Sequence, residues 1–238
     1  MNHFIDRVLN LVAPHICKGC GQAGAALCDR CIFYILDKKH AFCVVCGADS
    51  GAGKLTKRGN LCGKCAKIMP FTRAYAVGVR RGSLQKLVGD YKYNSERSAA
   101  IPIVRLLDKI LPNELPNDLT VVPITTIANN IRRRGFDHMR LVGKRLAKTR
   151  RLPFMPNLLL RTNNVAQHSQ TSPAARRQNA AKSLAINPRA KVPSKILLID
   201  DIFTTGATVE TAAKILRQNG AKEIWLAIVV RQSSKTSE

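Results

Sequence analysis

Four Cys-x-x-Cys pairs lie within residues 17–65 and account for all eight cysteines of the chain. The pairs are Cys17/Cys20, Cys28/Cys31, Cys43/Cys46 and Cys62/Cys65. Two residues between thiols allow both sulfurs of a tight turn to reach one tetrahedral ion, and four thiolates complete a closed structural zinc site. The spacing therefore predicts two structural Zn²⁺ ions held by a small cysteine-rich module.

The spacing leaves open how the four turns combine. A sequential grouping joins the first two pairs and the last two, and an interleaved grouping fits the same spacing. Disulfides suit secreted chains, whereas Asp6, Arg7 and Asn10 interrupt the apolar stretch that an export signal would need. A redox pair explains one Cys-x-x-Cys but not four. His15 and His40 are near enough to replace a thiolate, but we expect both at the surface.

A change of composition near residue 70 divides the chain into a predicted zinc-binding module, residues 1–69, and a predicted main domain, residues 70–238. Cysteine disappears after this point. The module has few apolar residues, so we expect metal binding to supply most of its folding energy. An apolar helical face over residues 4–12 predicts an N-terminal helix that Pro14 ends.

Charge is the second strong feature of the sequence. The 39 Lys and Arg against 15 Asp and Glu give a formal net charge of +24. Between Asp137 and Asp200 there are 13 basic side chains and no acidic one. Such a surface concentrates polyanions, including nucleic acid, phosphorylated metabolites and anionic lipid. A basic surface kept for solubility is the alternative, and at this charge we favour an anionic partner.

The apolar pattern excludes a membrane-spanning protein. The hydrophobic fraction of 45% is typical of a folded chain rather than a disordered one. No apolar run approaches the roughly 18 residues that a transmembrane helix needs. We therefore expect no membrane span and a cytoplasmic location.

Apolar strands alternate with helices after residue 70. The segments expected as strands are 74–79, 119–124, 157–161, 195–200 and 223–231. One helix is expected to begin after Gly82, and three more are expected over 137–150, 173–184 and 207–219. Alternation of this kind predicts an α/β fold with a mostly parallel sheet flanked by helices.

The segment 195–210 carries the clearest chemistry of the main domain. An apolar strand ends in Asp200 and Asp201, and a run of small and hydroxyl residues then opens a helix. The run is Thr204, Thr205, Gly206, Ala207 and Thr208. Free N–H groups at a helix start favour a phosphate, and ligands of parallel sheets bind beyond the carboxyl ends of the strands. Carboxylates just before such a loop can accept hydrogen bonds from ribose hydroxyls. The segment therefore predicts a ribose 5-phosphate site; a structural turn is the alternative.

This segment resembles the phosphoribosyl-diphosphate (PRPP) loop of the type I phosphoribosyltransferases. The resemblance implies that Asp200 and Asp201 are the catalytic pair facing the ribose 2- and 3-hydroxyls and that residues 204–208 hold the 5-phosphate. It also implies that Mg²⁺ accompanies PRPP, and that the loop Ile124, Thr125 and Thr126 lies on the pyrophosphate side.

The four cysteine pairs ahead of such a domain resemble the ComF (GntX) family of competence proteins. Further matches are VVPI at 121–124, RRRGF at 132–136, Gln167-His168, and Arg176-Arg177-x-Asn179. The chain has Asp137-His138 where the family commonly has Asn-Gln. The resemblance implies that a set of arginines binds diphosphate or DNA: Arg132, Arg133, Arg134, Arg176 and Arg177. An exposed basic turn is the plain alternative for Arg132–Arg134, and we expect His138 and His168 to be hydrogen-bonding loop residues.

Two functions fit these features. The first is a competence protein that handles incoming single-stranded DNA, with the ComF helicase and a recombination mediator as the partners that the resemblance implies. The second is an active phosphoribosyltransferase of nucleotide or salvage metabolism, which would use PRPP and Mg²⁺. We favour the first, because the sequence shows no hood segment that would present polar groups to a nucleobase acceptor.

Overall fold

The computed structural model describes residues 15–37, 42–48, 58–94, 96–161 and 184–232. The helices are α2 (Asp29–Asp37), α3 (Gly63–Ile68), α4 (Gly82–Tyr93), η1 (Arg97–Ala99), α5 (Ala100–Ile110), α6 (Ala128–Arg134), α7 (His138–Arg150) and α9 (Ala207–Gln218). The strands are β1 (Arg73–Val79), β2 (Thr120–Pro123), β3 (Leu159–Arg161), β4 (Leu184–Ile186), β5 (Lys195–Phe203) and β6 (Glu223–Arg231).

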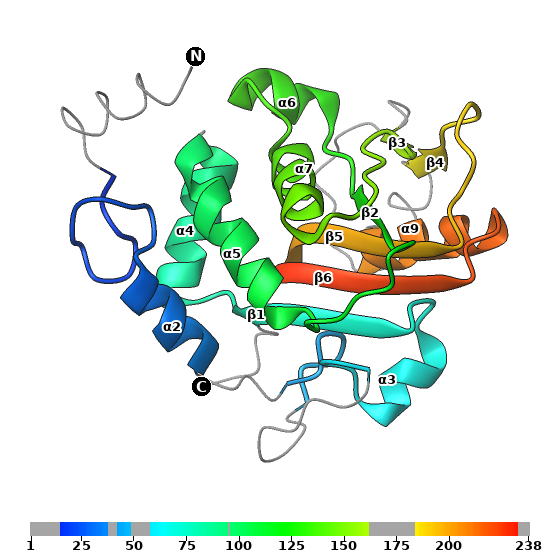
Figure 1. The fold of residues 1–238 in the computed structure, drawn as a ribbon, viewed down its shortest axis with the longest axis horizontal. Coiled ribbons are helices and arrows are strands. Elements are labelled where there is room, and N and C mark those ends of the chain that lie inside the picture. The colour runs from blue at the N-terminus through cyan, green and yellow to red at the C-terminus, as the bar shows by residue number, and fades with distance from the viewer. Residues whose placement is uncertain (1–14, 38–41, 49–57, 95, 162–183, 233–238) are drawn as a thin grey trace.

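A four-stranded parallel sheet of order β1-β6-β5-β2 forms the centre of the molecule, as the alternating sequence predicted (Figure 1). All strands of a parallel sheet end at one edge, so the residues that follow β2 and β5 come together there. The amide N–H of Ile124 donates to the carbonyl of Ile199 at 3.0 Å. Strands β3 and β4 form a separate antiparallel pair.

Alternating side chains of the sheet face two different cores. Tyr75 and Val77 belong to the core covered by α4, α5 and α7. Ala74 and Ala76 belong to the core covered by α9. The sheet is thus a middle layer between two apolar layers, which explains why its strands read as nearly continuous apolar runs.

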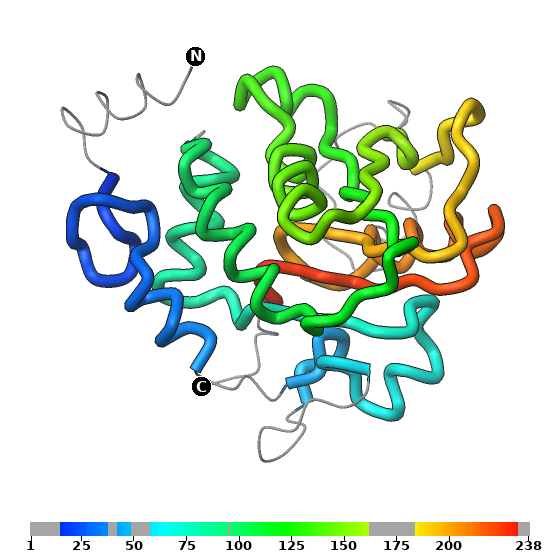
Figure 2. The backbone as a smooth tube through the Cα atoms, in the orientation of Figure 1, coloured from blue at the N-terminus to red at the C-terminus, as the bar shows by residue number. Residues whose placement is uncertain are grey.

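Each half of the cysteine-rich segment packs into one of these cores. Leu27 and Ile32 join the first core, and Val44 and Leu61 join the second. Figure 2 shows the first half beside α4 and α5 and the second half beneath β1. The division at residue 70 remains a prediction, and the residues on its two sides share both cores.

Several sequence predictions fall outside the described residues. These are the N-terminal helix, the motifs at 167–168 and 176–179, Arg176 and Arg177 themselves, and residues 173–183 of a predicted helix. The last residue of that predicted helix, Leu184, is the first residue of β4. Among the described residues, no helix combines the length and apolar content needed to cross a bilayer.

Candidate phosphate site and metal centres

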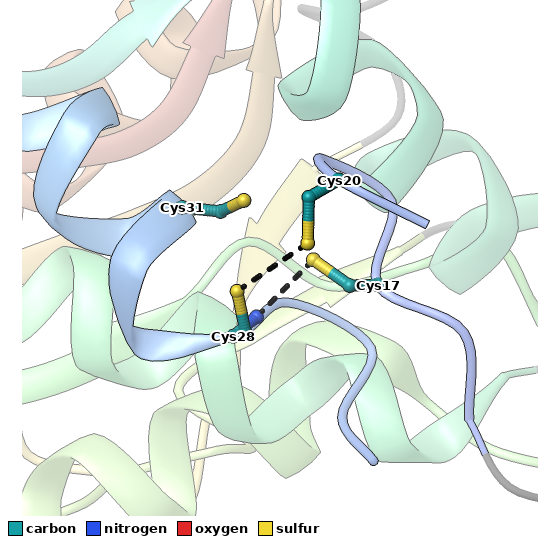
Figure 3. Close-up of side chains that lie close together, drawn as sticks. All are labelled: Cys17, Cys20, Cys28 and Cys31. Carbon is teal, nitrogen blue, oxygen red and sulfur yellow. Dashed lines mark hydrogen bonds between the residues drawn. The ribbon is translucent and has the colours of Figure 1, made fainter. Parts of the chain in front are cut away.

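The cysteines form two four-sulfur groups in sequential order. Within each group the Sγ atoms all lie within 4.8 Å of one another, and none of the eight is in a disulfide. The groups are Cys17/Cys20/Cys28/Cys31 (Figure 3) and Cys43/Cys46/Cys62/Cys65. This arrangement selects the sequential grouping over the interleaved one. Four soft sulfur ligands around one point can bind a metal ion and fit tetrahedral zinc.

Backbone N–H groups stabilise one thiolate of each group. The amides of Gly19 and Cys28 donate to the Sγ of Cys17 at 3.4 and 3.3 Å, and the amide of Cys62 donates to the Sγ of Cys43 at 3.5 Å. Burial alone would raise these pKa values, but the N–H donors outweigh it and lower the pKa of Cys17 to about 6 and that of Cys43 to about 7. Burial and the neighbouring thiols raise the pKa of Cys31 to about 12. Thiolate formation is thus favoured at one ligand of each group, as metal binding requires.

The predicted phosphate loop follows β5 as a turn into α9. Gly206 has φ 78° and precedes the first helical residue, Ala207. A Cβ on Gly206 would lie 2.5 Å from the ring of Phe203, so only glycine fits this turn. The Thr205 hydroxyl accepts the Ala207 N–H at 3.4 Å. The remaining first-turn amides have no side-chain cap within the described residues, so they suit an anion.

The two aspartates at the end of β5 have different surroundings. Asp201 is 4% exposed, whereas Asp200 is half-buried. Burial and the adjacent Asp201 charge raise the pKa of Asp200 to about 7. Burial would also raise the pKa of Asp201, but the hydrogen bond from His138 and the charge of Lys92 lower it well below its usual range. The pair therefore holds one firm negative charge and one carboxyl that titrates near neutral pH.

The loop after β2 lies beside this pair. Ile124 is buried against β5, as the hydrogen bond to Ile199 shows. Thr125 donates its hydroxyl proton to the carbonyl of Leu159, and its own carbonyl accepts Nε of Arg161 at 2.9 Å. Burial lowers the pKa of Arg161, and the charge of Asp200 opposes this shift. The Arg161 cation therefore lies within electrostatic reach of the acid pair.

The basic run is the end of α6 rather than a uniformly exposed turn. Arg132 and Arg133 are exposed, whereas Arg134 is 5% exposed and contacts His138. His138 makes the hydrogen bonds that were expected of it, but it does not lie in a loop: it is the first residue of α7, within the segment expected as a helix, and is 4% exposed. Asp137, directly before it, caps α7 by accepting the Arg140 amide at 3.1 Å, so the acceptor needed to start a helix is present in the sequence.

Two cationic side chains near the acids were missed from the sequence: Lys92 and Arg161. Lys92 and Arg161 occupy ordinary helix and strand-end positions that carry no motif. His138 was noted in the sequence as a departure from the family pattern, but its contact with Asp201 was not foreseen. The structure brings the loop 124–126, the acid pair and the loop 204–208 together at one sheet edge, while Arg176 and Arg177 lie outside the described residues.

Comparison with known proteins agrees with this geometry. The phosphoribosyl transferase domain family matches residues 159–238. A solved structure of the allosteric regulatory enzyme of purine biosynthesis is 21% identical over 59% of this chain and 30% of that one, with a TM-score of 0.39. This TM-score is too low to support an argument about the fold beyond the observed strand order. The parallel sheet, its flanking helices and the family match define a type I phosphoribosyltransferase-like domain.

Curated relatives include competence and DNA utilization proteins. Competence protein F of Haemophilus influenzae is 26% identical over 94% of this chain and 96% of that protein. DNA utilization protein YhgH of Salmonella typhi is 25% identical over 90% of this chain and 97% of that protein. Competence protein ComFC of Streptococcus pneumoniae is 52% identical over 40 residues, 17% of this chain and 18% of that protein. In its two four-cysteine groups, its phosphoribosyltransferase-like domain and its likeness to these relatives over about nine-tenths of its length, the chain is similar to the ComF family of competence proteins.

Proposed function

We propose that this protein handles single-stranded DNA in the cytosol during DNA uptake and binds PRPP or a related phosphoribosyl ligand with Mg²⁺. The observation that carries the ligand proposal is the β5–α9 turn, where uncapped helix amides follow Asp200, while the loop 124–126 is joined to the end of β5 through the hydrogen bond from Ile124 to Ile199. We also propose Zn²⁺ as the metal of both cysteine groups. The ComF helicase and a recombination mediator are the protein partners that we propose from the family.

A basic surface on α7 supports the DNA proposal. Its exposed cations follow one another at helical spacing: Arg140, Lys144, Arg145, Lys148 and Arg151. No acidic residue lies on α7 itself. Cations at spacings of three and four residues share one helix face, so this surface can follow a phosphate backbone. The exposed Arg132 and Arg133 at the end of α6 extend the basic surface along the chain.

Aromatic side chains for base stacking are few. Phe136 packs on Tyr91 at 5.7 Å between ring centroids, and the guanidinium of Arg97 lies 4.8 Å from its ring. Of the described aromatic residues, Phe33, Tyr34 and Tyr93 are more than half exposed. We therefore expect DNA binding to depend mainly on charge and to show little sequence preference.

The DNA proposal is tested with a labelled oligo(dT) followed by fluorescence anisotropy between about 50 and 200 mM salt. Contact with three to five phosphates gives a log–log slope of roughly −2 to −3.5. Lys144→Glu with Lys148→Glu should weaken binding and flatten the slope. The matched control reverses two exposed lysines of α3, Lys64→Glu with Lys67→Glu, with zinc content checked. Equal losses in both double variants would contradict a site on α7.

The ligand proposal is tested by calorimetry of Mg²⁺-PRPP with the zinc-loaded chain. Pyrophosphate release in the presence of a panel of bases and amines tests the alternative, an active phosphoribosyltransferase. Binding without pyrophosphate release would support a ligand-sensing role over transferase activity. Absence of binding to the zinc-loaded chain would contradict the PRPP proposal.

A further inference from the structure

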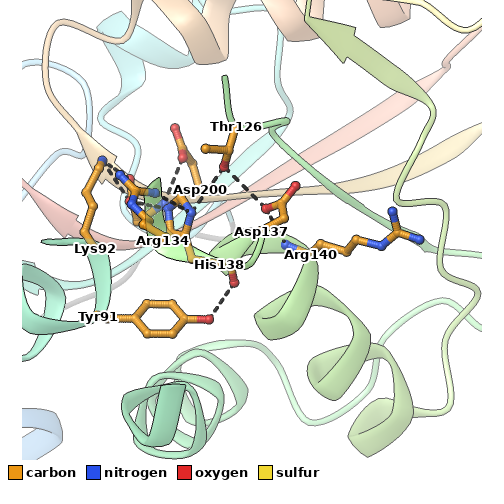
Figure 4. A network of polar contacts seen from close by, with 9 residues as sticks. Tyr91, Lys92, Thr126, Arg134, Asp137, His138, Arg140 and Asp200 are labelled. Atoms are coloured by element: carbon orange, nitrogen blue, oxygen red, sulfur yellow. Dashed lines mark hydrogen bonds and ion pairs between the residues drawn. The ribbon is translucent and has the colours of Figure 1, made fainter. Parts of the chain in front are cut away.

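A polar network inside the molecule joins four elements that are distant in the sequence. It runs from Lys92 on α4 to Asp201 on β5, then to His138 on α7 and Arg134 on α6. Figure 4 shows Lys92, Arg134 and His138 converging beside Asp200, with the Tyr91 hydroxyl donating to the backbone carbonyl of His138 at 2.6 Å.

Both carboxylate oxygens of Asp201 are engaged by this network. Lys92 Nζ lies 3.0 Å from Oδ1 and 2.8 Å from Oδ2, and His138 Nε2 lies 2.7 Å from Oδ2. The side chain of Asp201 is 6% exposed, so little of it can meet a ligand. From the described residues, the side chain of Asp200 instead accepts only the amide N–H of Asp201, at 2.9 Å from Oδ1.

The direction of the hydrogen bonds follows from the chemistry of arginine. A guanidinium only donates, so the 2.9 Å contact between Arg134 Nη1 and His138 Nδ1 requires the lone pair of Nδ1. The imidazole therefore carries its proton on Nε2 and donates it to Asp201. Contacts on both ring nitrogens fix the orientation of His138 between the acid and the arginine.

The network also reaches the predicted ligand loop. The hydroxyl of Thr126 lies 3.2 Å from His138 Nδ1 and donates to Asp137 at 3.3 Å. Arg134 Nε is buried and has no hydrogen-bond partner among the described residues. A buried donor of this kind is costly unless an acceptor reaches it, and the arginine that carries it is held in place by His138.

We propose that Asp201 is a positioning residue and that Asp200 alone of the acid pair meets the ligand sugar. Through His138, Asp201 fixes the positions of Arg134 and the loop 124–126 relative to the turn 204–208. This inference rests on the proposed phosphoribosyl site. It differs from the sequence resemblance, which implies that both acids face the ribose hydroxyls.

The experiment compares Asp200→Asn and Asp201→Asn in the full zinc-loaded chain. Calorimetry measures Mg²⁺-PRPP affinity, and thermal unfolding without ligand measures stability. Asp200→Asn should weaken affinity roughly tenfold or more, because it removes a charge-assisted hydrogen bond. It should not lower Tm, because the ionised Asp200 carboxylate itself costs stability at and above neutral pH. Asp201→Asn should lower Tm by roughly 6 °C or more, because it leaves buried partners uncompensated.

Two substitutions of His138 separate positioning from general destabilisation. His138→Gln keeps an N–H donor for Asp201 and an acceptor for Arg134, so it should restore nearly parental Tm and affinity. His138→Ala should reproduce the loss seen in Asp201→Asn. If Asp201→Asn fails to fold, the contrast between Gln and Ala at position 138 still decides the question.

The outcomes distinguish this inference from the proposed function. Equal loss of affinity in the two Asp→Asn variants, with no change in either Tm, would show that both acids touch the sugar and would overturn the inference. A parent chain that binds no PRPP would overturn the proposed ligand and the role of Asp200. The Tm values of the variants would then still test the structural role of Asp201 and His138. Values equal to the parent's in Asp201→Asn and His138→Ala would refute that role.

Discussion

The carboxyl of Asp200 should make ligand binding depend on pH around neutrality. Burial and the neighbouring Asp201 charge raise its pKa to about 7. A group with this pKa is about one-tenth ionised at pH 6 and about nine-tenths ionised at pH 8. If the ionised form accepts the ribose hydroxyls, Mg²⁺-PRPP affinity should fall about tenfold between pH 8 and pH 6.

The stability of the ligand-free protein should change in the opposite direction. The pKa of Asp200 is higher in the folded state than in the unfolded one, so its contribution to stability is present at low pH and lost as pH rises through about 7. Over the same two pH units this amounts to about 1.4 kcal/mol, or a rise of about 3–6 °C in Tm on going from pH 8 to pH 6.

Asp200→Asn is the control for both measurements. It removes the titrating carboxyl, so the remaining pH dependence of affinity should come only from the phosphates of the ligand, whose second pKa is about 6. Calorimetry and thermal unfolding at pH 6, 7 and 8 give the two profiles. The same pH dependence in parent and Asp200→Asn would refute the assignment of this titration to Asp200.

Three further changes test other parts of the structure. Elemental analysis should find two zinc ions in the parent and about one in either Cys17→Ser or Cys43→Ser; no zinc in the parent would contradict both sites. Gly206→Ala should abolish Mg²⁺-PRPP binding in calorimetry and lower stability by roughly 1–3 kcal/mol in urea unfolding, because its Cβ would meet an aromatic ring at 2.5 Å and its φ is positive. Arg231→Gln should lower stability by about 1–3 kcal/mol, since the guanidinium donates to the buried carbonyl of Val44 at 3.0 Å; a urea midpoint equal to the parent's would exclude that role.

The sheet could be predicted because its signals are local. The apolar run of 195–200 and the run of 223–231 correspond to β5 and β6, and the glycine turn after β5 was visible as a motif. Helix α5, Ala100–Ile110, was not predicted. Pro102 lies in its first turn, where proline is tolerated, although the same residue usually indicates a break.

The polar network could not be predicted, because it depends on distances between remote segments. Lys92 and Asp201 are 109 residues apart in the chain, and His138 is 63 residues from Asp201. Neither separation leaves a trace in spacing or periodicity. The motif identified two adjacent acids, but only tertiary structure shows that Asp201 contacts a lysine and a histidine while Asp200 is half-buried at the start of the predicted phosphate loop.

The cysteine-rich segment also differs from what spacing alone suggests, because it covers an edge of the sheet. β1 is the outer strand of the sheet order. The amide of Asn60 donates to the carbonyl of Ala74 at 2.7 Å, and its side-chain oxygen accepts the Ala76 amide at 3.2 Å. The amide of Ala74 donates to the carbonyl of Arg58 at 3.2 Å. These contacts satisfy backbone groups that an edge strand would otherwise expose.

Loss of the second metal group should therefore cause aggregation as well as loss of zinc. The residues that pair with β1 lie between Cys46 and Cys62, so their position depends on that group. An uncovered parallel edge strand is a template for pairing with other chains. Cys43→Ser should increase light scattering and thioflavin T fluorescence on incubation at 37 °C. Cys17→Ser, which disturbs the group on the other core, is the matched control, and equal aggregation in both variants would refute a specific role of the second group in covering β1.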